Sequence, residues 1–596
     1  LSWQGTVLNI LTLDYETYFD DNYTLKKLTT EHYVRNPRFE VLGCGLSMDG
    51  KPPVWVPQEH LAAQLDVIDW SQTAVLCHHA HFDGLILSHH YGTKPRFIFD
   101  TLSMARLMLG NHVSASLGSV AAHYGLAPKN VPYDLFKGKH WSDLPLDTRN
   151  ALGAGCLHDV HLTRDIFGRL AQGFPPEEYQ VIDMTVRMFT EPQLTGDTDV
   201  FAKVWTFEVE RKKQLLAELG VAPGDLQSAD KFAALLQAEG IEPEKKAGKN
   251  GPIYAFAKTD DFMQELLEHD DERIRCLAEA RLGLKSTLDQ TRAERLGFMA
   301  TRGSMPVYLS YCGAHTTRWS GGDKLNWQNF KRGSDLRKGS RAPAGYKIVK
   351  ADKAQIECRI LNYVAGQHDV IERFKDGHDP YLPIASQFYG REITKDDKAE
   401  RGVGKQLELS CGYGAGADTI VRTAKRGTYG PPVQLTQAEG LAARDLYRST
   451  HPGVVDYWRQ AGRIISALAG TGHPIQWGPL TVDTGVIRCQ GIPIWYPELE
   501  FHRDGEGEEY WRYKTRKGWA KLYGGKLVEN VVQFMSRVDM SQSLLRILQR
   551  TGIRPAQLEH DAAVWVVKES LVTPFASVVS EEMTRAPTWL PGIPLA

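Results

Sequence analysis

One stretch, residues 346–361, most narrows what this chain can fold into. It predicts a buried strand from Tyr346 to Ala351 that ends at one acid, Asp352. A helix should follow, because Ile356, Ile360 and Tyr363 recur at i, i+4 and i+7 and mark one apolar face. A carboxylate at the carboxyl end of a strand, beside a helix start, is well placed to hold a divalent cation. The alternative is an ordinary strand–helix junction with a capping acid.

The composition describes an ordinary globular protein of several domains, since 596 residues exceed the usual domain size. The net charge of -2 gives no global sign of nucleic-acid binding, so such contacts would need local basic patches. The 8 cysteines stand singly, which argues against a zinc module or a disulfide framework. We find no apolar run of ~20 residues and no signal peptide, and expect no membrane contact and a cytoplasmic location.

A second acidic constellation lies near the amino end. An apolar run over residues 5–13 predicts a strand that ends at Asp14 and Glu16, whose side chains point to the same side. A second apolar run, 74–77, leads to Asp83, and Asp159 lies in a predicted helix. Neighbouring carboxylates repel each other unless a cation sits between them. The pattern therefore favours a metal site, with scattered surface acids as the alternative.

Asp-x-Glu, then Asp, then Asp in this order resembles the four-carboxylate 3′→5′ exonuclease domain. The resemblance implies an RNase H-like α/β fold over residues 1–175, with Asp14, Glu16, Asp83 and Asp159 holding two metal ions. Asp100 also fits the family, but we expect it to be structural.

Two positions depart from this exonuclease pattern. His79 stands where the family has Asn, and Gly155 stands where it has the Tyr that orients the attacking water. Either His158 substitutes for that Tyr or the exonuclease is weakened.

Residues 352–360, Asp-x-x-Gln-Ile-Glu-x-Arg-Ile, resemble the first catalytic motif of family A (polymerase I type) DNA polymerases. His560-Asp561 in a predicted hairpin resembles the third motif, with Ala562 in place of its Glu. The resemblance implies that Asp352 and Asp561 share a sheet and hold two Mg²⁺, which Mn²⁺ can replace. Glu357 matches the position that crowds a 2′-OH and selects deoxynucleotides.

Four residues, Arg401, Lys405, Leu409 and Tyr413, recur at four-residue steps and predict one stripe of a helix. Two cations one turn apart can clasp a triphosphate, while a ring farther along meets the base. This resembles the family's fingers helix, except that Leu409 replaces Phe or Tyr, so dideoxynucleotide discrimination cannot be carried over. Gln355 and Tyr381 complete the nucleotide-binding residues that the resemblance implies.

Three glycines in this segment, Gly402, Gly404 and Gly412, each disfavour a helix by up to ~1 kcal/mol relative to Ala. That suits a helix that moves when a nucleotide binds, or a helix that is closely packed.

Contacts to DNA are expected in two regions. The segment around Arg318, Asn326, Gln328 and Asn329, together with Gln533, resembles the residues that touch the minor groove of the primer–template. Residues 176–305 predict a helical thumb with a flexible basic tip near 245–250. There Lys245, Lys246 and Lys249 would contact phosphates without sequence preference, although such charged loops are usually just solvated.

The resemblance covers nearly the whole chain and implies a multidomain α/β and α+β protein, phage-like and without a 5′-nuclease domain. The expected order is the exonuclease domain (1–175), thumb (176–305), first palm part (306–365), fingers with hairpins (366–530) and second palm part (531–596). The implied function is template-directed DNA synthesis from dNTPs on a primer–template, with proofreading. We expect a monomer, with any processivity factor unidentified.

Three alternatives stay open. A single-subunit RNA polymerase shares the catalytic scheme, but Glu357 and the amino-terminal acids argue against it. A catalytically inert nucleic-acid clamp, or an exonuclease whose second half only binds DNA, is opposed by the joint presence of Asp352, Asp561, Arg401 and Lys405.

Overall fold

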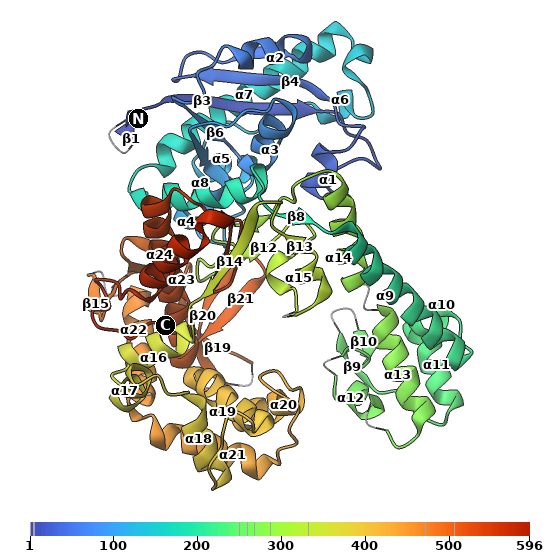
Figure 1. Ribbon diagram of the computed structural model, residues 1–596, viewed down its shortest axis with the longest axis vertical. Helices are drawn as coiled ribbons and strands as arrows, with labels where there is room; N and C mark the ends of the chain where they lie inside the picture. The colour runs from blue at the N-terminus through green and yellow to red at the C-terminus, as the bar shows by residue number, and fades with distance from the viewer. Residues whose placement is uncertain are drawn as a thin grey trace. The chain divides into compact units, whose positions relative to one another are not determined.

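The computed structural model describes residues 2–3, 6–248, 251–258, 260–267, 269–285, 288–331, 333–470, 473–505 and 507–596 (Figure 1). The chain forms two compact units. Unit 1 comprises Leu1–Pro192, Pro306–Gln328 and Ala344–Ala596, and unit 2 comprises Gln193–Met305 and Asn329–Pro343.

A mixed five-stranded sheet organises the amino-terminal part of unit 1. The strand order is β5-β4-β3-β6-β7, in which β3 pairs antiparallel with β4 and parallel with β6. The central strand β3 is almost wholly buried because it has a strand on either side and α7 packs across it and β4 (Figure 1). The strands are β3 (Asn9–Thr17), β4 (Val41–Met48), β5 (Val54–Pro57), β6 (Thr73–Cys77) and β7 (Phe97–Asp100), preceded by a small pair, β1 (Ser2–Trp3) and β2 (Thr6–Val7).

Helices follow the strands of this sheet directly. Asp100 ends β7 and caps α4, accepting hydrogen bonds from the Leu102 and Ser103 backbone N–H groups, so its role is structural as expected. The helices are α1 (Thr30–Val34), α2 (Gln58–Asp66), α3 (Ala80–His90), α4 (Thr101–Met108), α5 (Leu117–His123), α6 (Tyr133–Phe136), α7 (Leu146–Leu170) and α8 (Pro176–Thr190).

The strand predicted over residues 346–351 exists, but the expectation that it is buried is wrong. It forms β14 (Tyr346–Asp352), an edge strand of the antiparallel sheet β14-β23-β22, and Tyr346 and Ile348 are 37% and 42% exposed. An edge strand has a partner on one side only, and Asp352 at the end of β14 is exposed. The other strands of this sheet are β22 (Gln557–Glu559) and β23 (Ala562–Lys568). The same part of unit 1 contains α16 (Ile356–Val364), α23 (Gly524–Thr551), α24 (Val572–Thr584) and the short strand pair β11 (Leu309–Ser310) and β12 (Ser320–Gly321).

The core of unit 1 includes α23, whose residues Val531, Val532 and Phe534 are fully buried. Because α23 runs continuously from Gly524, the expected domain boundary at 530/531 falls inside this helix. Helix α8, expected to begin the thumb at 176, belongs to unit 1, where Glu178 accepts two hydrogen bonds from the Arg537 guanidinium, at 2.7 and 2.6 Å.

Residues 366–530 form helices followed by two antiparallel sheets, β15-β16-β17-β18 and β19-β20-β21. The helices are α17 (His368–Lys375), α18 (Tyr381–Tyr389), α19 (Lys398–Ser410), α20 (Ala417–Lys425), α21 (Gln437–Thr450) and α22 (Pro452–Gly470). The strands are β15 (Ile475–Trp477), β16 (Leu480–Asp483), β17 (Val486–Cys489), β18 (Ile492–Trp495), β19 (Glu500–Arg503), β20 (Glu509–Thr515) and β21 (Gly518–Leu522).

Unit 2 is mainly helical and has its own core, with Leu226, Phe232, Leu236, Met263 and Leu277 among its most buried residues. The expected flexible basic tip is instead a hairpin of β9 (Lys245–Gly248) and β10 (Gly251–Tyr254). Residues 329–343, expected in the palm, join unit 2 because β13 (Ser340–Arg341) pairs with β8 (Thr195–Gly196). The helices are α9 (Thr198–Leu219), α10 (Pro223–Gln227), α11 (Ala229–Ala238), α12 (Asp261–Leu267), α13 (Glu272–Lys285), α14 (Leu288–Thr301) and α15 (Asp335–Lys338).

Candidate functional sites

The two acids predicted to act together, Asp352 and Asp561, meet at one end of the three-stranded sheet. Asp352 ends β14 and is in register with Ala562, the residue after Asp561. Asp561 lies in the turn between β22 and β23, where the Lys353 backbone N–H donates to its carbonyl oxygen at 3.0 Å. His560 makes this tight turn with a left-handed φ of 54°. The structure therefore brings together two residues that are far apart in sequence.

This acid pair carries an excess of negative charge. Burial raises the pKa of Asp561 to about 6; the charges of Glu357 and Asp352 add to the rise, while Arg318 opposes it. Clustered carboxylate oxygens at one end of a sheet are the ligands that Mg²⁺ and Mn²⁺ prefer. Asp352 and Asp561 thus fit a divalent cation.

Arg318 and Glu357 flank the acid pair. One Arg318 nitrogen lies 2.6 Å from Glu357 Oε1 and 3.1 Å from Asp561 Oδ1. The Tyr413 hydroxyl donates to Glu357 Oε2 at 2.7 Å. Four of the predicted site residues therefore form one connected group, in which Arg318 contacts acids.

The helix stripe predicted from Arg401 to Tyr413 is only partly helical. Helix α19 ends at Ser410, and Tyr413 lies in a following 3₁₀ turn, Cys411–Tyr413, so the expectation of one continuous helix is wrong. Arg401 donates from Nε and a second nitrogen to Asp379 Oδ2, at 2.8 and 2.7 Å, and lies over the Tyr381 ring. Lys405, half-buried, follows one turn later.

Close packing accounts for two glycines of α19. A Cβ added at Gly404 would lie 2.3 Å from the Tyr381 carbonyl oxygen, and one at Gly402 would lie 3.0 Å from the Gly430 Cα. Both neighbours are backbone atoms, which cannot move away as a flexible side chain can. The structure therefore favours packing over helix flexibility as the reason for these residues.

The side chains of the other predicted nucleotide-binding residues are partly or fully buried. Leu409 is partly buried and packs against a cluster that includes Ile371 and Phe374. Tyr381 is only 4% exposed. Gln355 precedes α16 in a left-handed conformation with φ 51°.

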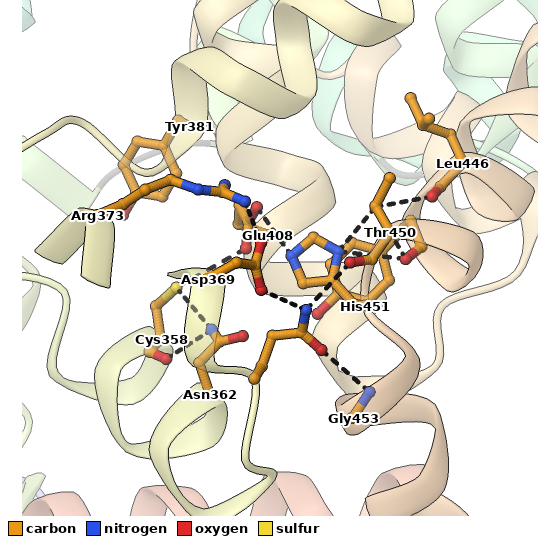
Figure 2. Close-up of polar contacts among 12 residues, drawn as sticks. Cys358, Asn362, Asp369, Arg373, Tyr381, Glu408, Leu446, Thr450, His451 and Gly453 are labelled. Atoms are coloured by element: carbon orange, nitrogen blue, oxygen red, sulfur yellow. Dashed lines mark hydrogen bonds and ion pairs between the residues drawn. The ribbon is translucent and has the colours of Figure 1, made fainter. Parts of the chain in front are cut away.

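Beneath α19 lies a buried polar cluster (Figure 2). His451 Nε2 is 3.4 Å from Glu408 Oε1, and both side chains are at most 2% exposed. His451 Nδ1 lies 3.2 Å from the Tyr447 carbonyl oxygen and 2.9 Å from the Thr450 hydroxyl. Sequence reasoning missed this pair, which no short motif marks.

The residues predicted to contact DNA are spread over both units. In unit 1, Gln328 is buried and its backbone N–H donates to Asn326 Oδ1 at 2.9 Å. Gln533 lies on α23. In unit 2, Asn329 is exposed. The hairpin residue Lys245 lies over the Tyr254 ring, and Lys246 pairs with Asp260 at 2.5 Å. Lys249 lies outside the described residues.

The four amino-terminal acids also converge. Asp14 and Glu16 lie on β3, Asp83 in the first turn of α3 and Asp159 on α7. The Tyr15 N–H donates to Asp83 Oδ1 at 3.2 Å. Burial, followed by the charge of Asp159, raises the pKa of Asp14 to about 7, and burial and the charge of Asp14 raise those of Glu16 and Asp83.

Two further residues belong to this four-acid site and were not predicted. The Cys156 thiol donates to the Asp14 carbonyl oxygen at 3.2 Å, and ligand-type atoms of Asp14, Glu16 and Cys156 lie within 4.8 Å of one another. Lys129 forms an ion pair with Asp159. The cysteine, three residues before Asp159, was within reach of sequence reasoning; the lysine, in a loop, was not. The donor set of buried carboxylates fits divalent cations.

The departures from the exonuclease pattern have structural explanations. His79 Nε2 hydrogen-bonds with the Tyr308 hydroxyl at 3.0 Å. A Cβ at Gly155 would lie 2.9 Å from the Val131 Cα, so a tyrosine there has no room. His158 Nε2 lies 3.0 Å from the Pro128 carbonyl oxygen and so contacts the loop that precedes α6.

A cavity of about 580 Å³ opens beside Glu16. Aromatic rings and lysines line it together with the acid, among them Phe19, Tyr33, Phe82, Tyr133, Lys26 and Lys137. Rings that stack on bases and cations that contact phosphates are the features of a site for single-stranded nucleic acid.

Among the described residues, no helix is long and apolar enough to span a bilayer.

Comparison with known proteins agrees with this geometry. The profile of the family described as DNA polymerase family A matches residues 205–467, a range that includes Asp352 and α19 but neither Asp561 nor the four acids. A DNA polymerase of Bacillus phage SP02 is 26% identical over 267 residues, 42% of this chain and 40% of the relative. DNA polymerase I of Chloroflexus aurantiacus is 24% identical over 369 residues, 58% of this chain and 38% of the relative.

The chain thus spans about two fifths of the length of the curated relatives it matches. A solved structure, the POL domain of Pol1 from M. smegmatis in complex with DNA primer-template and dNTP, superimposes with a TM-score of 0.69. The match covers 99% of this chain and 94% of that one at 16% identity, and so shows a shared fold. The chain is thus similar to family A DNA polymerases over residues 205–467, and it shares the fold of the Pol1 POL domain.

Proposed function

We propose that this chain is a template-directed DNA polymerase that adds deoxynucleotides to a primer 3′-OH and carries a 3′→5′ exonuclease. The observation that carries the proposal is the meeting of Asp352 and Asp561 at the open end of one sheet, joined to Glu357 and Tyr413 through Arg318. This constellation puts metal-binding oxygens beside residues that can contact a nucleotide.

For synthesis, Asp352 and Asp561 would hold Mg²⁺. Bound there, Mg²⁺ would supply the positive charge that favours the attacking 3′-oxyanion and the phosphate oxygens of the transition state. Arg401 and Lys405, one turn apart on α19, would bind the triphosphate; Arg401 would exchange its partner Asp379 for phosphate oxygens. The Glu357 carboxylate, held on both oxygens, would exclude a 2′-OH.

For proofreading, Asp14, Glu16, Asp83 and Asp159 would hold the ions of the exonuclease. The cavity beside Glu16 would receive the 3′ end of a single strand, with its rings against the bases and its lysines against the phosphates. Residues 1–175 would then be the exonuclease domain and unit 2 most of the thumb. The sheet with β14 would be the palm and the helices α17–α21 the fingers.

The partners of this activity would be primer–template DNA and dNTPs. Arg318, Asn326, Gln328, Asn329 and Gln533 would contact the DNA minor groove, while Lys245 and Lys246 would add phosphate contacts without sequence preference.

Extension of a labelled primer on a DNA template tests the proposal. Wild type with Mg²⁺ should extend with dNTPs but not with rNTPs, and Asp352→Asn should lose extension while still binding DNA. Shortening of the primer without nucleotides should persist in Asp352→Asn and disappear in Asp14→Asn. Extension with rNTPs would favour an RNA polymerase, and binding without extension would favour a clamp.

A further inference from the structure

A lysine lies inside the four-acid site. Lys129 Nζ forms an ion pair with Asp159 Oδ2, whose side chain is 0% exposed. Among the described residues, neither Asp159 oxygen has a hydrogen-bond partner apart from this ion pair. The Lys129 charge also lowers the pKa values of Asp14 and Glu16, which burial and their neighbours raise. The ammonium is therefore the cation that compensates this cluster of acids.

The loop that carries Lys129 is fixed to the same helical turn as Asp159. His158 lies 3.0 Å from the Pro128 carbonyl oxygen, and Gly155 packs so closely on Val131 that a Cβ there would be 2.9 Å from the Val131 Cα. Lys129 lies between these two contacts. Its Nζ is 5.3 Å from the centre of the Tyr133 ring, which lines the cavity beside Glu16. The loop thus inserts a cation into the acid cluster and keeps it at the edge of the cavity.

An ammonium and a divalent ion on the same carboxylate repel each other, so each weakens the binding of the other. A cation that binds Asp159 through Oδ2 competes with Lys129 for that oxygen and weakens the ion pair. The charge of the lysine also repels the arriving ion.

We propose that Lys129 is a built-in counter-ion of the four-acid site, which a divalent ion displaces from Asp159 Oδ2, so that the 128–133 loop sets the metal concentration at which this site fills. The proposal rests on the proposed exonuclease function. Once displaced, the ammonium stays on its loop beside the cavity, where it faces the phosphates of the strand. Lys129 is in this sense a positioning residue that acts through the metal site.

Chemical labelling of the wild-type full chain tests the displacement without any variant. Lysine acetylation, read out by peptide mass spectrometry, should be slow at Lys129 in EDTA and several-fold faster in saturating Mg²⁺. Lys137, which pairs with the exposed Asp21, is the internal reference and should not change. An unchanged rate at Lys129 would overturn the proposal.

Metal affinity tests the energetic claim. In full-length Asp352→Asn/Asp561→Asn protein, which silences the other acid pair, Mn²⁺ binding is measured by electron paramagnetic resonance. Lys129→Met should bind Mn²⁺ at least about tenfold more tightly, roughly 1.4 kcal/mol, and Lys129→Arg, which keeps the charge, should match the parent protein. Equal or weaker binding by Lys129→Met would contradict the counter-ion role.

A further variant separates failure of this inference from failure of the proposed function. Asp159→Asn should weaken Mn²⁺ binding in the same background. If it binds as the parent does, the four acids are not a metal site and the proposed exonuclease fails. If it binds weakly while Lys129→Met equals the parent, the exonuclease proposal stands and only the role of Lys129 is overturned.

Discussion

Tyr413 and Glu357 are joined by a hydrogen bond of 2.7 Å between the tyrosine hydroxyl and the Glu357 carboxylate. Glu357 lies in the first turn of α16, and Tyr413 lies in the turn that follows α19. The bond therefore ties α16, beside Asp352 and Asp561, to the turn that follows α19, the helix proposed to bind the triphosphate. Arg318 holds the other Glu357 oxygen at 2.6 Å, so the carboxylate is fixed in place.

Replacing Glu357 should relax sugar selection. With Glu357→Ala the fixed carboxylate is gone, and the preference for dNTP over rNTP should fall by about 10–200-fold, the range that one steric group in a pocket commonly supplies. The kcat/KM values for the two nucleotides measure this preference. Tyr413→Phe keeps the ring and should have a smaller effect; an unchanged preference in Glu357→Ala would refute the role.

Removing the Arg318 charge should move the acidic limb of polymerase activity to higher pH. Asp561 must be ionised to hold a cation, and its pKa of about 6 includes a lowering by Arg318. Arg318→Met removes this lowering, so activity should fall off at a higher pH as the solution is acidified. The pH profile of kcat/KM checks it, with Arg318→Lys as the charge-retaining control; a coincident limb in both variants would contradict the assignment.

Leu409→Phe should change the discrimination between dideoxynucleotides and dNTPs. Leu409 packs partly buried against the cluster that includes Ile371 and Phe374, so a larger ring must repack against this cluster and alter the surface of α19 around it. Steady-state incorporation of ddNTP against dNTP measures the ratio. Leu409→Met, close in volume, should leave it near wild type, and identical ratios for all three proteins would exclude a role for this position.

Breaking the buried His451–Glu408 pair should destabilise the protein. His451→Leu leaves a carboxylate buried without its partner, and such losses cost about 3–5 kcal/mol. Urea-induced unfolding measures the change. The matched control is Glu408→Leu/His451→Leu, which leaves no unpaired charge and should lose clearly less. A double variant as unstable as the single one would show that packing, and not charge pairing, is what matters there.

Without metal, the stability of the chain should fall as the pH rises from about 4 to about 7. Asp14 has its pKa raised to about 7, so in this range the folded state keeps a proton that the unfolded state has lost, and folding is favoured at the lower pH. Thermal unfolding in EDTA across this range tests it. Asp14→Asn should flatten the dependence, and Mg²⁺ should reverse it near pH 7; an identical slope in Asp14→Asn would assign the effect to other groups.

Local patterns predicted the elements well where the signal lies within a few residues. The apolar run before Asp14 and the one before Asp83 form β3 and β6, and the helix after Asp352 begins at Ile356 as its apolar spacing indicates. The same local signals did not predict correctly which strands are exposed to solvent. The apolar residues of 346–351 predicted burial, but an edge strand has a neighbour on one side only.

The regular spacing of residues also gave a wrong prediction where tertiary contacts end a helix. The steps from Arg401 to Tyr413 suit a helix, yet α19 ends at Ser410. Trp458 donates to the Gly412 carbonyl oxygen at 2.9 Å, and a Cβ at Gly525 would be 2.4 Å from the Tyr413 carbonyl oxygen. Contacts from distant helices hold this turn, and no window of sequence contains them.

From the sequence alone, alternation along a strand put Asp14 and Glu16 on one side, and the resemblance to polymerase motifs paired Asp352 with Asp561 without coordinates. Only the tertiary structure decided which positively charged side chains lie beside those acids. Arg318 lies 243 residues from Asp561 in sequence, and Lys129 reaches Asp159 from a separate loop. Charge attraction acts through space, whereas a sequence pattern records only neighbours along the chain, so the counter-charges of both sites emerged only once the chain was folded.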